Sequence, residues 1–167
     1  HTRSLCDWSS DVCSSDLLVG VAAVVASRAL VRRTRWGRAM HHTLRDGLLD
    51  LTPDRAALAP LALSAAVGEE LLFRGAMLPT LAPQFGAAGA VTASALAFGL
   101  LHFPRTRALA PWTATALLMG LVFGALYAVT GEVLAPVAAH ALINYENLHF
   151  LLAHDLGEDP EIGRAHV

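Results

Sequence analysis

The chain has 167 residues, a formal net charge of −2 at pH 7 and a mean hydropathy of +0.49, with 54% hydrophobic residues. This hydrophobic content exceeds that of an average soluble domain, and the length suits one domain. The near-neutral charge gives no basic surface for a nucleic acid, so we predict a lipid bilayer as the partner and no nucleic acid.

The two ends of the sequence resemble translated sequencing adapter rather than native protein. Asp11–Asp16 can be encoded by GAC GTG TGC TCT TCC GAT, and the reverse complement of that DNA encodes Ile162–Val167. Because chance agreement over this length is very small, we predict that residues 1–16 and 162–167 are artefacts. Residues 17–161 are then the native domain, truncated at its N-terminus, and the fold is argued from them alone.

Apolar segments separated by short polar ones predict an all-α integral membrane bundle of about five transmembrane helices. The first is Leu17–Leu30. The arginine-rich stretch 28–38 follows it and contains Trp36, a combination typical of the cytoplasmic interface of a membrane protein. His41 and His42 lie in this polar linker, where we expect them to be solvated.

A longer helix begins after the capping sequence Thr52–Asp54 and extends to about Leu78, with a kink or restart at Pro60. Prolines and a glycine at residues 79–86 end it. Three further apolar helices are predicted, over Ala87–Phe103, Pro111–Thr130 and Val133–Ala153. An up-and-down path through these helices puts the arginines of stretch 28–38 and those of loop 105–107 on one side of the membrane.

Two adjacent carboxylates and an arginine interrupt the longer helix. Ionisable groups at membrane depth cost about 2.5–3.5 kcal/mol each and usually mark function. Glu70 and Arg74 are i, i+4 neighbours and can form an ion pair, whereas Glu69 lies about 100° round the helix without that partner. In a soluble protein an ordinary surface salt bridge would be the better interpretation, but the apolar surroundings favour a functional site.

Further polar side chains lie on the apolar helices that follow. His102 ends one of them, and His140 and Asn144 share a face of the last, one turn apart. A single polar cavity would satisfy all of these groups. Glu69 with His102 could deprotonate a water, directly or through a divalent metal, and His140 with Asn144 could donate hydrogen bonds to an oxyanion. That chemistry is peptide-bond hydrolysis within a membrane.

Three ordered motifs carry a resemblance to a known family: Glu69-Glu70-x-x-x-Arg74, Phe98-x-x-x-His102 and His140-x-x-x-Asn144. They resemble the motifs of the CAAX prenyl protease and bacteriocin-processing family of intramembrane endopeptidases, over about Leu61 to Leu152. The resemblance implies a membrane-associated peptide or protein as substrate. It also implies that the first glutamate and His102 activate water, that the last motif stabilises the oxyanion, and that the second glutamate and the arginine support them.

Family members are often called metalloproteases, and Glu69, His102 and His140 could supply a three-ligand zinc site with an open position for water. The same residues could also hold water without a metal. Arginine as the sole cationic side chain, with abundant alanine, suggests a GC-rich genome and hence a bacterial cytoplasmic membrane. Two other classes remain open: a non-catalytic immunity or scaffold protein, and a small proton-coupled transporter that uses Glu69 and the histidines as a relay.

Overall fold

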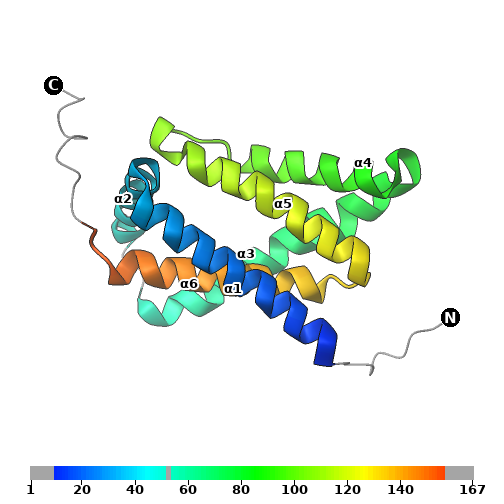
Figure 1. Ribbon diagram of the computed structural model, residues 1–167, viewed down its shortest axis with the longest axis horizontal. Helices are drawn as coiled ribbons and strands as arrows, with labels where there is room; N and C mark the ends of the chain where they lie inside the picture. Colours follow the sequence, from blue (N-terminus) through cyan, green and yellow to red (C-terminus); the bar gives the residue numbers. More distant parts are fainter. Residues whose placement is uncertain (1–9, 52–53, 157–167) are drawn as a thin grey trace.

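The computed structural model describes residues 10–51 and 54–156, and these residues form helices and short connections with no strand. The elements in chain order are α1 (Ser10–Arg33), α2 (Arg35–Asp50), the 3₁₀ turn η1 (Arg55–Ala57), α3 (Leu58–Glu70), the π-helix η2 (Leu71–Met77), α4 (Leu78–Leu101), the 3₁₀ turn η3 (Arg107–Leu109), α5 (Ala110–Thr130) and α6 (Leu134–Ala153). The predicted all-α class is confirmed (Figure 1).

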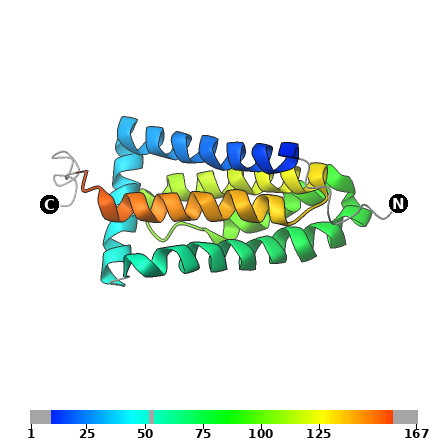
Figure 2. The same ribbon diagram turned by 90° about the horizontal axis from the view of Figure 1, so that it is seen from below.

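The long helices run along a common direction, and α2 crosses one end of the bundle nearly at right angles to them (Figure 2). At the opposite end the chain reverses direction within α4 and again between α5 and α6 (Figure 2). A glycine with positive φ stands at each reversal, Gly86 (φ 69°) inside α4 and Gly131 (φ 73°) at the end of α5. Because α2 packs against η3, the arginine-rich segments 28–38 and 105–107 lie at the same end of the bundle, as the up-and-down path predicted.

Two parts of the structure are long and apolar enough to cross a membrane, Arg55–Leu101 and Arg107–Thr130. The first contains the reversal at Gly86, which separates α4 into a short piece before that residue and a longer piece after it. Among the described residues no other helix reaches the same length and hydropathy. The total of about five transmembrane helices therefore stays a prediction.

The segment expected to be a polar linker is an amphipathic helix, α2, and the expectation that His41 is solvated is wrong. Its side chain is only 1% exposed, and Nε2 donates to the His154 carbonyl at 3.0 Å. The reason is helical periodicity, because His41 shares an inward face with Met40 and Leu48 while charged residues occupy the outer face. Burial lowers the pKa of the His41 imidazole, so the ring is neutral and holds α2 onto the end of α6.

Close packing between α4 and α5 depends on small residues. A Cβ added at Gly120 would lie 3.0 Å from the Ala95 Cα, and one added at Gly124 would lie 3.0 Å from a Val91 methyl. The four-residue spacing of these glycines therefore serves contact within the chain.

The predicted start of the longer helix is only partly within the described residues, because the predicted cap residues Thr52 and Pro53 lie outside them. Asp54 caps η1, and the predicted restart at Pro60 corresponds to the junction of η1 and α3.

Candidate active site

The site begins where α3 changes its helical period. The sequence predicted one regular helix as far as Leu78, but the seven residues Leu71–Met77 form a π-helix. Glu69 and Glu70 are the last residues of α3, and Arg74 lies within the π-helix. Single turns of π-helix are rare and are often found at functional sites, because they redirect side chains that a regular helix would align differently. Nothing in the local sequence indicated this change.

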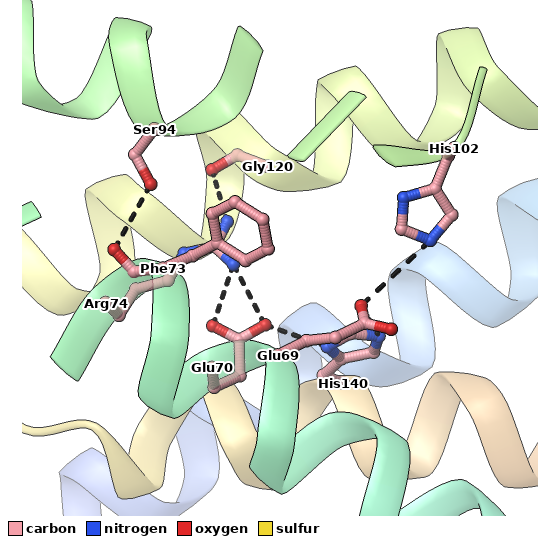
Figure 3. Close-up of polar contacts among 8 residues, drawn as sticks. All are labelled: Glu69, Glu70, Phe73, Arg74, Ser94, His102, Gly120 and His140. Atoms are coloured by element: carbon pink, nitrogen blue, oxygen red, sulfur yellow. Dashed lines mark hydrogen bonds and ion pairs between the residues drawn. The ribbon is translucent and has the colours of Figure 1, made fainter. Parts of the chain in front are cut away.

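Glu70 and Arg74 form a fully buried ion pair. Arg74 Nη1 lies 3.0 Å from each carboxylate oxygen of Glu70, and both side chains have no solvent exposure (Figure 3). The second guanidinium nitrogen, Nη2, donates to the Gly120 carbonyl of α5 at 2.8 Å. Phe98 and Phe123 flank the guanidinium carbon, with ring centroids at 5.0 and 5.5 Å. The predicted pairing is confirmed.

Glu70 has a second partner that the sequence did not indicate. His140 Nδ1 donates to Glu70 Oε1 at 2.8 Å, across 70 positions of sequence. The His140 ring also stacks on Phe123, with centroids 5.0 Å apart and an interplanar angle of 27°. Because an ionised carboxylate only accepts hydrogen bonds, Nδ1 of His140 carries a hydrogen, and its Nε2 is turned toward Glu69.

Glu69 points the other way, toward two imidazoles. Its Oε2 lies 4.0 Å from His102 Nε2 and 3.9 Å from His140 Nε2 (Figure 3). The Glu69 side chain is 27% exposed, yet Oε2 is buried and accepts no hydrogen bond from the described residues. A buried carboxylate oxygen without a partner is costly in a static protein, so this atom is placed to meet something that enters the site.

His102 reaches Glu69 because its own helix is short. The piece of α4 after Gly86 spans about 22 Å and α6 spans about 30 Å, so the shorter helix covers less of the length of the bundle. His102 Nδ1 donates to the Phe98 carbonyl at 2.8 Å, which leaves Nε2 of the neutral ring as an acceptor directed toward Glu69.

A cavity of about 350 Å³ connects these groups. Glu69, His102, His140 and Asn144 line it, whereas Glu70 and Arg74 lie behind its wall. The cavity continues toward α2 along apolar side chains, among them Leu30, Val31, Met40, Leu44 and Leu148. The predicted residues therefore converge on one place, and the predicted polar cavity has an apolar extension that the motifs did not reveal.

Glu69, His102 and His140 are the predicted ligands of a metal ion. A tetrahedral zinc holds its nitrogen and oxygen donors at about 2.0–2.1 Å, which places neighbouring donors about 3.4 Å apart. The two separations from Glu69 Oε2 are 3.9 and 4.0 Å. No group of His, Cys, Asp and Glu in the described part of the chain is arranged to hold a metal ion. The donor set does not fit zinc as it stands, and the metal stays a prediction.

The fold and the cavity together define a class of protein: an all-helical membrane bundle that encloses a carboxylate and two imidazoles contributed by separate helices. Comparison with known proteins is more specific. The chain belongs to the Rce1-like family of type II CAAX prenyl endopeptidases, which it matches over residues 53–145. This is a family of membrane-embedded proteases, so the resemblance drawn from the three motifs is confirmed.

A curated relative supports the same assignment. The chain is 30% identical over 136 residues to the protein named CAAX prenyl protease 2 of Rattus norvegicus. The aligned part is 80% of this chain and 35% of the rat protein, so the chain spans about a third of that relative's length. No solved structure matches the chain significantly.

Proposed function

We propose that the chain is an intramembrane endopeptidase that hydrolyses a peptide bond of a membrane-associated protein or peptide, with Glu69 as the general base. One observation carries this proposal: Glu69 Oε2 is buried without a hydrogen-bond donor, lines the cavity, and lies about equally far from the Nε2 atoms of His102 and His140. A nucleophilic water at this point would fill the missing hydrogen bond.

The acceptor directions support a bridging water held by Glu69 and His102. Both Glu69 Oε2 and Nε2 of the neutral His102 ring are acceptors, and they lie 4.0 Å apart. One water can donate a hydrogen to each of them at about 2.8 Å, because its two donors diverge by about the required angle. In this position its oxygen lone pairs are free to attack a carbonyl carbon in the cavity.

The charge balance of the cluster supports a second role for His140. Its Nδ1 already donates to Glu70, so Nε2 can donate to an oxyanion only when the ring is doubly protonated. The cluster then holds two carboxylates, one guanidinium and one imidazolium, with a formal charge of zero, as suits an apolar environment. Asn144, one turn farther along α6 and on the wall of the same cavity, offers an amide as a second donor.

The reaction follows from these positions. Glu69 removes a proton from the water as the water oxygen bonds to the scissile carbonyl carbon, and the negative charge on the carbonyl oxygen is met by His140 Nε2–H and Asn144. Glu69 then delivers its proton to the leaving nitrogen as the carbon–nitrogen bond breaks. A new carboxylate and an amine result. Glu70 and Arg74 keep the His140 ring in place and touch no reacting atom.

Purified protein in liposomes tests the proposal. Membrane peptides with and without a prenylated cysteine are incubated in ¹⁸O-labelled water, and mass spectrometry follows the fragments. Hydrolysis incorporates one ¹⁸O into the new carboxylate with the wild-type protein and not with Glu69→Gln. Cleavage that persists in the variant contradicts the role of Glu69. Proton flux through the liposomes without cleavage would instead identify the transporter.

We also propose a bacterial cytoplasmic membrane as the location, with the end of the bundle that carries α2 in the cytoplasm. The support is the common position of the arginines of 28–38 and 105–107 at that end, because loops rich in arginine stay on the cytoplasmic side. In a protein with Cys6 and Cys13 replaced by serine, a cysteine introduced in place of Thr106 should react with a membrane-impermeant thiol reagent only after the cells are opened. Labelling in intact cells would reverse the orientation.

A further inference from the structure

The outer face of α1 changes from apolar to cationic along its length. Leu18, Val21 and Val25 are 67%, 51% and 63% exposed, and their spacing of three and four residues puts them on one face. Arg28 and Arg32 continue the same line toward the end of the helix. The face therefore presents hydrocarbon over two turns and guanidinium groups over the next two.

A groove of about 410 Å³ lies where the character changes, between α1 and α6. It is lined by Val25, Ala29, Arg28, Arg32, Arg33 and Glu146, among others. Three guanidinium groups against one carboxylate leave the lining with a formal charge of +2. The lining combines apolar side chains with guanidinium groups, which suits a ligand with a hydrocarbon part and an anionic part.

Arg28 lines the groove, and the described residues do not use all of its hydrogen-bond donors. Its Nη2 lies 2.8 Å from Glu146 Oε2 and 3.1 Å from the Glu146 carbonyl, and its guanidinium carbon lies 4.5 Å from the centroid of the Phe150 ring. Its Nε is buried and has no hydrogen-bond partner among the described residues. A guanidinium has five donors arranged for planar anionic oxygens, and the Arg28 side chain is 27% exposed, so an entering phosphate can meet its outer donors.

We propose that this face of α1 is a binding site for an anionic glycerophospholipid. An acyl chain lies along Leu18, Val21 and Val25, and the phosphate sits among Arg28, Arg32 and Arg33. The dimensions agree, since Leu18 and Arg28 are about 15 Å apart along the helix axis and one leaflet of a bilayer core of about 30 Å has that thickness. The proposal is independent of the proposed proteolysis.

The phosphate part is tested by thermal unfolding of the detergent-solubilised protein with added phosphatidylglycerol or phosphatidylcholine at equal mole fractions. The double variant Arg32→Gln/Arg33→Gln is compared with Arg105→Gln/Arg107→Gln, which removes the same charge from another exposed site at the same end of the bundle. Phosphatidylglycerol should raise the melting temperature of the wild type and the control by about 4–8 °C more than phosphatidylcholine does. The Arg32/Arg33 variant should lose that difference.

The hydrocarbon part is tested with soluble glycerol phosphate, which should produce no shift in any variant, and with Val21→Ser/Val25→Ser, which should lower the number of phosphatidylglycerol molecules retained in native mass spectrometry. A shift from glycerol phosphate equal to that from the lipid would identify a free-phosphate site and overturn the proposal. An equal response of both arginine variants would overturn it too. A lipid-free dimer formed through this face of α1 would also overturn the proposal, because a second copy of the chain would then cover the face.

Discussion

The two faces of the helix end at Glu69 and Glu70 have opposite surroundings, one closed by charged partners and the other open to a cavity. On the Glu70 side the carboxylate has no exposure and contacts Arg74 and His140, and both of these lie against aromatic rings. On the Glu69 side the carboxylate lines a cavity, and the imidazole nitrogens facing its Oε2 are 3.9 and 4.0 Å away. Adjacent residues thus separate two tasks: one carboxylate stabilises the arrangement of three helices, and the other is available for chemistry.

The difference follows from charge compensation. In apolar surroundings a carboxylate remains ionised at modest cost only when cationic partners contact it directly. Glu70 has a guanidinium and an imidazole at hydrogen-bond distance, whereas the imidazole nitrogens nearest to Glu69 are 3.9 Å or more away. Substitutions on the two faces should therefore have opposite consequences, one for turnover and the other for folding.

The largest effect is expected for Glu69→Gln. Glutamine has the same shape as glutamate, but its amide cannot take a proton from water. General-base catalysis contributes up to about 10⁴-fold, so kcat should fall by about 10³–10⁴. The melting temperature should stay unchanged, because the lost group accepts no hydrogen bond from the described residues. Glu132→Gln, at an exposed position in the turn between α5 and α6, is the matched control and should keep full activity. A Glu69→Gln protein that turns over substrate normally would place the chemistry elsewhere.

Substitutions on the Glu70 face should lower the free energy of unfolding. Removal of one partner from a buried ion pair leaves the other charge uncompensated and costs about 3–5 kcal/mol, whereas replacement of both is often tolerated. Glu70→Gln and Arg74→Met should each lower the free energy of unfolding by that amount, and the double variant should lose less than either single variant. Denaturant unfolding of the four proteins in a double-mutant cycle measures the coupling. Additive losses would show that the pair is not a unit.

Much of this arrangement could be predicted from the sequence, because it depends on local spacing. The i, i+4 relation of Glu70 and Arg74 is local, and it is confirmed. The predicted helix end at about Leu78 is wrong in position, because the chain stays helical past Pro79 and Pro83 and breaks only at Gly86. The hydrogen bond from His140 to Glu70 could not be predicted, since it joins residues 70 positions apart through tertiary packing. The π-helix was missed because Gly75 is the one poor helix former among residues 71–77, and a single glycine does not specify a change of helical period.

The prediction for His41 failed for a different reason. A histidine beside five arginines suggests a solvated segment, but one face of α2 is buried. That face could be identified only from the structure, which shows α2 lying across the end of the bundle. The roles of Glu69, His102, His140 and Asn144 stay predictions. The structure brings their side chains to one cavity.

A smaller effect on turnover is expected for Asn144→Ala. The amide is proposed as one of two oxyanion donors, and loss of one such donor typically lowers kcat by about 10²–10³. Asn147→Ala is the control, since this residue has the same chemistry, lies on the same helix and lines the same cavity, but accepts a hydrogen bond from Ser27. The control should lose less than about threefold in steady-state assays. Equal losses in both variants would point to a general disturbance of α6 rather than to an oxyanion.

The smallest effect is expected from metal removal. If Glu69 and His102 hold the water directly, dialysis against phenanthroline should change kcat by less than about twofold, because no charge in the neutral cluster depends on a metal. Added zinc or cobalt should then restore nothing. If the cavity instead contracts around a metal, with the donors drawn from 3.9–4.0 Å to about 3.4 Å apart, chelation would abolish turnover and zinc would rescue it. In that case His140 would be a neutral ligand oriented by Glu70, and Asn144 would be left as the proposed oxyanion donor.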